Sequence, residues 1–90
     1  MPRRAERDPR SKLFGAAVRD LRQARGWTQD DLAKRAQLSA TYVGLVERGE
    51  NAATLPIIVQ LAEALDVNAG DLIECATVQS KRRRSKSTSN

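Results

Sequence analysis

The chain has 90 residues, a net charge of +5, one cysteine and no histidine. This composition argues against zinc sites and against histidine-dependent catalysis, so we expect no enzyme, no metal and no cofactor. A lone Cys75 cannot form an intramolecular disulfide. We see no signal peptide and no apolar stretch of membrane-spanning length, and therefore expect a cytoplasmic protein with no membrane partner.

The basic surplus lies at the two ends of the chain. Residues 1–12 carry five basic and two acidic side chains, residues 13–80 six and nine, and residues 81–90 five basic ones. We expect a flexible basic arm at 1–12, a folded domain at 13–76 and a disordered basic tail at 77–90. Arm and tail can follow phosphates or simply aid solubility. The candidate residues for phosphate contacts are Arg3, Arg4, Arg7, Arg10, Lys81, Arg82, Arg83, Arg84 and Lys86.

Abundant leucine and alanine with only three aromatic residues favour an all-α fold. Apolar spacing predicts a first helix from Leu13 to Ala24, with Ser11 as its cap and Gly26 after its end. A second helix of about eight residues is expected after Thr28, because Asp31 stands three residues later in a variant of the capping box.

A third short helix is expected between Ser39 as N-cap and Gly49 as stop, with Val43 and Val46 on its buried face. The link from helix two, Gln37 and Leu38, is so short that the two helices must cross steeply.

Two more helices complete the predicted domain. Thr54 caps the fourth, whose first turn tolerates Pro56. Asn68 and Asp71 repeat the cap pairing ahead of a short fifth helix.

The residue pattern agrees with one family across the whole predicted domain. Its parts are Gly26-Trp27-Thr28-Gln29-Asp30-Asp31-Leu32-Ala33, Leu38-Ser39, Val43-Gly44-Leu45-Val46-Glu47-Arg48-Gly49, Leu61-Ala62-Glu63-Ala64-Leu65-Asp66-Val67 and Asp71-Leu72. Together they resemble the lambda-repressor-like, or Cro/Xre, family of helix-turn-helix DNA-binding domains, over roughly residues 14–73. The resemblance implies a compact five-helix domain whose helices two and three form the helix-turn-helix.

A helix can enter the DNA major groove only if one face is anchored while the other projects toward base edges. The third helix has this division, with Val43 and Val46 on the anchoring side. The other side carries Ser39, Ala40, Thr41, Gly44, Leu45 and Arg48, with Tyr42 near the boundary.

The family resemblance implies base contacts from Ala40, Thr41 and Leu45, with Ser39 and Gly44 beside them. Many relatives have Gln, Arg or Lys at these positions, whereas the side chains here offer mainly apolar contact with thymine methyls and one hydroxyl. Specificity would then rest on Thr41, Tyr42, Arg48 and DNA shape.

Phosphate contacts are implied for Gln29 and, beside it, Thr28 with its backbone N–H, because a helix N-terminus suits a phosphate. The alternative is that these two residues only cap the helix. Arg48 and Asn51 are further phosphate candidates, although Arg48 could instead interact with the C-terminus of its own helix.

The resemblance also implies an ion pair between Arg22 and Glu47 that fixes the recognition helix to the scaffold; the alternative is two independent solvated residues. Trp27 is expected in the core. Gln37 stands where many helix-turn-helix sequences have glycine for a positive φ, so this turn is expected to be strained or differently shaped.

These observations predict a transcriptional regulator that binds double-stranded DNA at a roughly palindromic operator as a homodimer. Dimerisation through helices four and five follows from the small core and from Ile57, Val59 and Ile73 on an expected apolar surface. Chains of this length resemble phage repressors and restriction-modification controller proteins, which implies a bacterial, phage or plasmid origin, a nucleoid-associated location and no small-molecule ligand. The alternatives are an antitoxin-like module that also binds a partner protein, and a general nucleic-acid binder acting through its tails.

Overall fold

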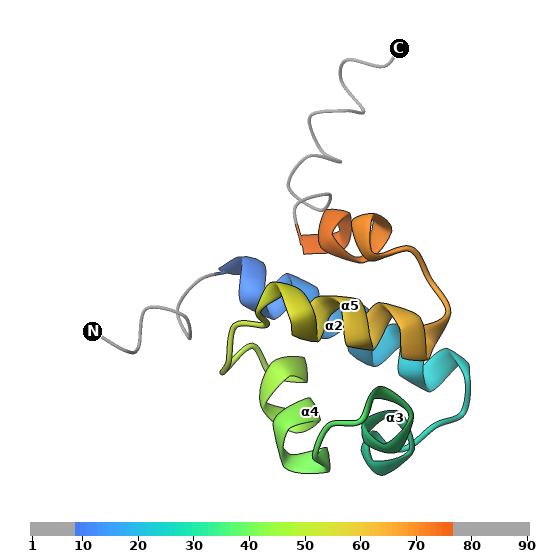
Figure 1. The fold of residues 1–90 in the computed structure, drawn as a ribbon. Coiled ribbons are helices and arrows are strands. Elements are labelled where there is room, and N and C mark those ends of the chain that lie inside the picture. Colours follow the sequence, from blue (N-terminus) through green and yellow to red (C-terminus); the bar gives the residue numbers. More distant parts are fainter. Residues whose placement is uncertain (1–8, 77–90) are drawn as a thin grey trace.

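The computed structural model describes residues 9–76, which are all-α (Figure 1). The helices are α2 (Pro9–Ala24), α3 (Gln29–Ala36), α4 (Ala40–Glu47) and α5 (Leu55–Leu65), followed by a helical segment at 69–76. The all-α prediction is thus confirmed. Helix α3 has the expected length of about eight residues, and α4, which was expected to be short, has 8 residues as well.

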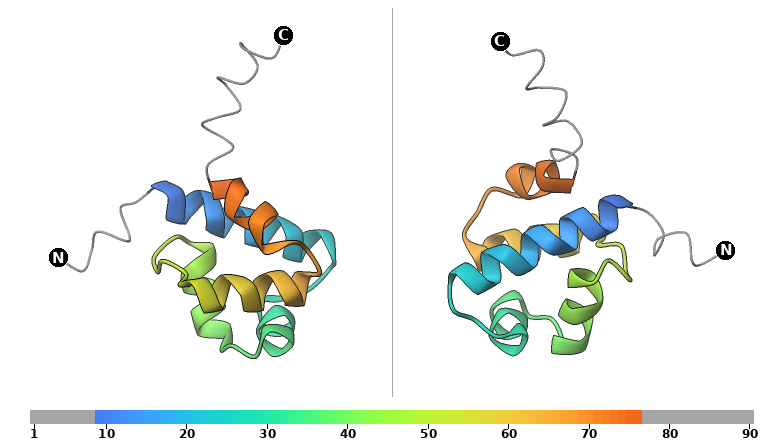
Figure 2. Two further views of the ribbon diagram at one scale, coloured as in Figure 1. Left: turned by 45° about the horizontal axis from the view of Figure 1, so that its top comes forward. Right: turned by 180° about the vertical axis from the view of Figure 1, so that it is seen from behind.

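The helices surround one apolar core. Helix α2 packs against α4, α4 against α3, and both α2 and α3 against α5. Figure 2 shows α3 and α4 together on one side of α2, with the segment 69–76 on the other side. The largest fully buried side chains are Val18, Leu32, Val43, Val46, Leu61, Leu65 and Leu72. Every described helix therefore contributes to one shared core, and α4 packs directly on α2 and α3.

The first helix begins at Pro9, four residues before the expected start at Leu13. Proline is compatible with a first helical turn because its fixed φ suits the helix and its missing N–H has no partner there. Ser11 consequently lies inside the helix and is not its cap. Residues 9–12 of the predicted arm are helical, whereas residues 1–8 and the predicted tail at 77–90 lie outside the described residues.

Side-chain caps set the starts of α3 and α4, as predicted. The backbone N–H of Asp31 donates to Thr28 Oγ1 at 3.0 Å, and the N–H of Thr28 donates to the Asp31 carboxylate at 2.9 Å. Ser39 Oγ accepts from the N–H of Tyr42 at 3.0 Å. Thr54 occupies the N-cap position of α5 without a side-chain cap hydrogen bond.

Two hydrogen bonds hold the pKa of Asp31 below its ordinary value. The larger effect comes from the backbone N–H of Thr28, and the smaller from the Thr28 side chain. A carboxyl group whose pKa is lowered by folding stabilises the fold above its unfolded pKa. This contribution is lost as the pH falls through the folded pKa.

Gly15 marks the closest approach of α2 to α4. A Cβ at this position would lie 2.2 Å from the carbonyl oxygen of Val46 and 2.5 Å from that of Glu47. Both neighbours are backbone atoms of α4. The absence of a side chain at Gly15 therefore lets α2 reach the backbone of the predicted recognition helix.

The predicted apolar surface on α5 and residues 69–76 is present, but one of its three predicted residues is not exposed. Val59 and Ile73 are exposed, but Ile57 is half-buried and packs against the core. The most exposed large apolar side chain is instead Leu55, at 65%. Ile57 turns inward because it stands four residues before the buried Leu61, on the same face of α5. Ile58 also packs on the core, so the apolar stripe of α5 is wider than the minimal pattern suggests.

Gln37 ends α3 in the left-handed region, with φ 62° and ψ 43°, as expected from its place in the turn. Its N–H donates to the carbonyl oxygen of Lys34, and that of Leu38 to Ala33. The turn thus keeps the backbone geometry that glycine usually provides. Glutamine adopts it at a cost in free energy, because its Cβ is strained in the left-handed conformation.

We expect Gln37→Gly to raise the free energy of unfolding by about 0.5–1 kcal/mol, because the relief of left-handed strain exceeds the extra entropy of glycine in the unfolded chain. The matched control is Gln23→Gly in the right-handed last turn of α2, which should lower it by about 0.5–1 kcal/mol. Urea titration followed by circular dichroism measures both. Equal losses in the two variants would contradict the assignment of strain to Gln37.

Candidate nucleic-acid interface

Helix α4 is anchored to the scaffold along one side. Val43 and Val46 are 0% and 1% exposed, and Glu47 is buried despite its charge. Gly15 brings α2 against the last turn of α4. The position of α4 is therefore set by apolar packing, backbone contact and a buried carboxylate at the same crossing.

The Glu47 carboxylate accepts three hydrogen bonds from two other helices. Arg22 of α2 donates to it from Nε at 2.7 Å and from Nη2 at 3.0 Å, and Gln29 of α3 donates from Nε2 at 3.0 Å. The Glu47 side chain is 1% exposed and that of Arg22 is 10% exposed. The expected pair between Arg22 and Glu47 is therefore present as a buried, bidentate contact, and Gln29 extends it to α3.

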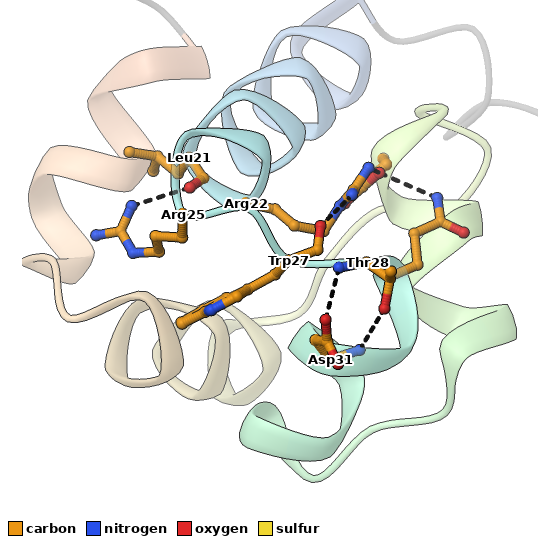
Figure 3. A network of polar contacts seen from close by, with 8 residues as sticks. Leu21, Arg22, Arg25, Trp27, Thr28 and Asp31 are labelled. Carbon is orange, nitrogen blue, oxygen red and sulfur yellow. Dashed lines mark hydrogen bonds and ion pairs between the residues drawn. The ribbon is translucent and has the colours of Figure 1, made fainter.

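Arg22 also fixes the turn between α2 and α3. Its Nη1 donates to the carbonyl oxygen of Trp27 at 2.7 Å (Figure 3). The hydrogen bond to Glu47 raises the pKa of Arg22 against the opposing effect of burial, so the guanidinium stays charged throughout the neutral range. Its contribution to stability is present below the unfolded pKa and is lost only as the pH rises through the folded one.

Trp27 packs half-buried on the core, in accord with its expected structural role. The guanidinium carbon of Arg35 lies 4.2 Å from the ring centroid, and that of Arg25 lies 5.8 Å away. Arg25 also donates from Nη1 to the carbonyl oxygen of Leu21 at 2.9 Å (Figure 3). Trp27 thus holds the turn that carries Thr28 and Gln29.

The outer side of α4 presents short side chains. Ser39 and Thr41 are exposed, whereas Ala40, Tyr42 and Leu45 are half-buried. Thr28 is exposed at the start of α3 and takes part in the capping box, and Asn51 is half-buried in the loop after α4. The structure thus gathers Thr28, Gln29 and the α4 candidates on the α3–α4 side of the domain.

Gly44 is not open on this outer side, because it is buried beneath two longer side chains. A Cβ at Gly44 would lie 3.2 Å from Arg48 Nη1 and 3.4 Å from Gln29 Oε1. The two phosphate candidates therefore converge over the middle of α4. A base edge can reach Gly44 only if these side chains move aside.

Arg48 has a partner that the sequence analysis did not identify. Its Nε donates to Glu50 Oε2 at 3.1 Å and its Nη2 to Glu50 Oε1 at 3.3 Å. The sequence had suggested a DNA phosphate as the partner of Arg48, with the C-terminus of its own helix as the alternative.

The candidate interface offers hydrogen-bond donors that could bind an anion. Gln29 keeps one amide hydrogen beyond its bond to Glu47, and Thr41 presents a hydroxyl group.

Within residues 9–76, no group of three or more His, Cys, Asp or Glu residues is placed so that it could hold a metal ion. Over the same residues, no helix has the length and apolarity needed to cross a membrane.

A family model described as helix-turn-helix matches residues 18–72, which include α3, the turn and α4. The chain belongs to the Cro/Xre-type helix-turn-helix family. This places it among non-enzymatic DNA-binding proteins that regulate transcription.

Individual helix-turn-helix proteins are similar over different shares of their length. The transcriptional regulator PrpR of Mycobacterium tuberculosis is 44% identical over 60 residues, which are 66% of this chain but only 12% of PrpR. Control protein C.BamHI of Bacillus amyloliquefaciens is 34% identical over 67 residues, covering 73% of this chain and 83% of C.BamHI.

A solved helix-turn-helix structure is similar in both fold and sequence. The restriction-modification controller protein C.AhdI of Aeromonas hydrophila matches with a TM-score of 0.67 and 42% identity, over 69% of this chain and 94% of C.AhdI. Both the sequence and the fold of the described domain are therefore those of the helix-turn-helix family.

Proposed function

We propose that this helix-turn-helix protein regulates transcription by binding a roughly palindromic operator as a homodimer. In this proposal α4 of each subunit enters one of two successive major grooves, about 34 Å apart. The observation that carries the proposal is the asymmetry of α4, whose one side is locked by Val43, Val46 and Glu47 while Ser39 and Thr41 project from the other. A rigidly seated helix with a free outer side can be inserted into a groove without unfolding its support.

The second subunit is proposed to cover the exposed apolar side chains of α5 and of residues 69–76. Leu55, Val59 and Ile73 are 65%, 37% and 41% exposed. A shallow apolar pocket between Phe14, Ala53, Ile58 and Ala76 adjoins Ile73. Burial of these side chains between two copies would add apolar contacts. A domain of this size buries little apolar surface in its own core, so such contacts would stabilise it.

The likeness to control proteins extends over most of their chains, whereas PrpR matches only in a small part. We therefore propose regulation of the controller type, in which the concentration of the protein and cooperative operator binding set the response. Phosphate contacts from Gln29 and Thr28 would position α4, and Thr41 would contact a base edge.

Selection of random duplex DNA by the purified full chain tests this proposal. The expected product is a two-fold symmetric motif with half-sites one helical turn apart. Thr41→Ala should weaken binding of that motif by about 0.5–1.5 kcal/mol per half-site through loss of one hydrogen bond.

Thr54→Ala is the matched control, because Thr54 is exposed and makes no cap hydrogen bond. It should leave affinity at the wild-type value. Recovery of no enriched motif at moderate salt would refute operator binding. An asymmetric motif bound by a monomer in sedimentation analysis would refute the homodimer.

A further inference from the structure

An exposed ion pair lies directly after α4. Arg48 and Glu50 are joined by bonds of 3.1 and 3.3 Å, and their side chains are 54% and 48% exposed. The carboxylate contacts the Nε and Nη2 groups, which form one of the two edges from which a guanidinium can donate two parallel hydrogen bonds. A DNA phosphate uses the same kind of edge.

The pair lies within the candidate interface and not elsewhere on the surface. The Arg48 side chain runs back along α4, so that Nη1 is 3.2 Å from the point where a Cβ of Gly44 would stand. The amide oxygen of Gln29 is 3.4 Å from the same point. Arg48 is thus held beside the side chain at the N-terminus of α3 that is proposed to contact a phosphate.

We propose that Glu50 is an internal competitor of the DNA backbone, and that it limits the affinity of the protein for duplexes of any sequence by engaging Arg48. The inference rests on the proposed function, in which the α3–α4 side meets DNA. The Glu50 carboxylate and a phosphate oxygen are both acceptors for the Nε–Nη2 edge, so one must leave before the other can bind there. Because both partners are exposed, the pair is weak enough for DNA to displace it.

The effect concerns the sequence-independent part of the affinity. Phosphate contacts supply nearly all non-specific binding and a large share of specific binding, but they carry no base information. When Glu50 holds Arg48, the phosphate contribution to the binding free energy is smaller for every duplex, whatever its sequence. Base contacts from the outer side of α4 then make up a larger fraction of the total.

The test compares the full chain with Glu50→Gln by fluorescence anisotropy, using the selected operator and a scrambled duplex of equal length. We expect Glu50→Gln to bind both duplexes more tightly, by a factor of up to about five per subunit, which is the strength of an exposed ion pair. Affinity should also fall more steeply with salt, by up to about 0.9 in the log–log slope for each subunit, the value for one added phosphate contact.

Asp20→Asn is the matched control, because Asp20 is an exposed carboxylate of α2, outside the proposed DNA-binding and dimer surfaces, and its replacement changes the net charge equally. It should leave both affinities near the wild-type values. In an Arg48→Ala background, Glu50→Gln should give no further gain, because there is no guanidinium to release.

Three results would overturn the inference. A gain that persists in the Arg48→Ala background would show that Glu50 acts by simple repulsion of DNA. A changed base preference would show that Arg48 reads a base, and unchanged affinity in Glu50→Gln with normal operator binding would overturn the inference alone. Failure of the wild-type chain to bind either duplex would instead refute the proposed function, and the inference with it.

Discussion

Gly15→Ala is expected to lower the free energy of unfolding by about 3 kcal/mol, the upper end of the usual cost of overpacking. The added methyl group would be 2.2 Å and 2.5 Å from the carbonyl oxygens of Val46 and Glu47. Both atoms belong to the backbone of α4, so no side chain can rotate away and the two helices must separate. Their separation would also stretch the hydrogen bonds between Arg22 and Glu47 at the same crossing.

The matched control is Gly44→Ala, a second glycine within a helix. The nearest atoms to its added methyl group belong to the flexible side chains of Arg48 and Gln29, at 3.2 and 3.4 Å. Helix propensity favours alanine by about 0.8–1.0 kcal/mol, so stability should stay the same or rise. Urea denaturation followed by Trp27 fluorescence measures both variants. Equal stability of Gly15→Ala and the wild-type chain would contradict the close packing of α2 on α4.

Glu47→Ala is expected to lower the free energy of unfolding by about 3–5 kcal/mol. The change removes the acceptor of three hydrogen bonds and leaves the guanidinium of Arg22, a residue only 8% exposed, without its carboxylate. Since a domain of this size has a total stability of about 5 kcal/mol, much of the variant should be unfolded at room temperature.

The double variant Arg22→Met, Glu47→Leu separates the loss of a partner from a loss of packing. With both charges gone, apolar side chains of similar size should recover most of the stability, because no desolvated charge remains. Glu63→Ala, at an exposed position, should change stability by at most about 0.5 kcal/mol. A Glu47→Ala variant no less stable than Glu63→Ala would contradict the buried network.

Local signals explain why α3 and α4 could be predicted from the sequence. Thr28 and Ser39 each accept a hydrogen bond from a backbone N–H three residues later, so their capping role can be predicted without knowledge of the fold. The positive φ of Gln37 is likewise a property of a short turn. The pairing of Arg22 with Glu47 spans 25 residues, and only the family resemblance suggested it.

The features that the sequence did not predict depend on tertiary neighbours. Nothing in the sequence distinguishes Gly15 from any other helical glycine, because its role comes from the backbone of α4 that lies against it. Gly44 is covered because Gln29 and Arg48 reach over it from opposite ends of the motif. Glu50 binds Arg48 only because the chain turns back after α4, and a spacing of two residues carries no helical pairing signal.

The most direct test of the account is an amide chemical-shift map of the isotope-labelled full chain, titrated with the selected operator duplex. We expect the largest changes at Gln29, Thr41 and Arg48, with small changes at Val59 because the protein is already dimeric before DNA is added. Changes concentrated on residues 69–76 or on the chain ends, with α4 unaffected, would contradict the assignment of the α3–α4 side as the DNA-binding surface.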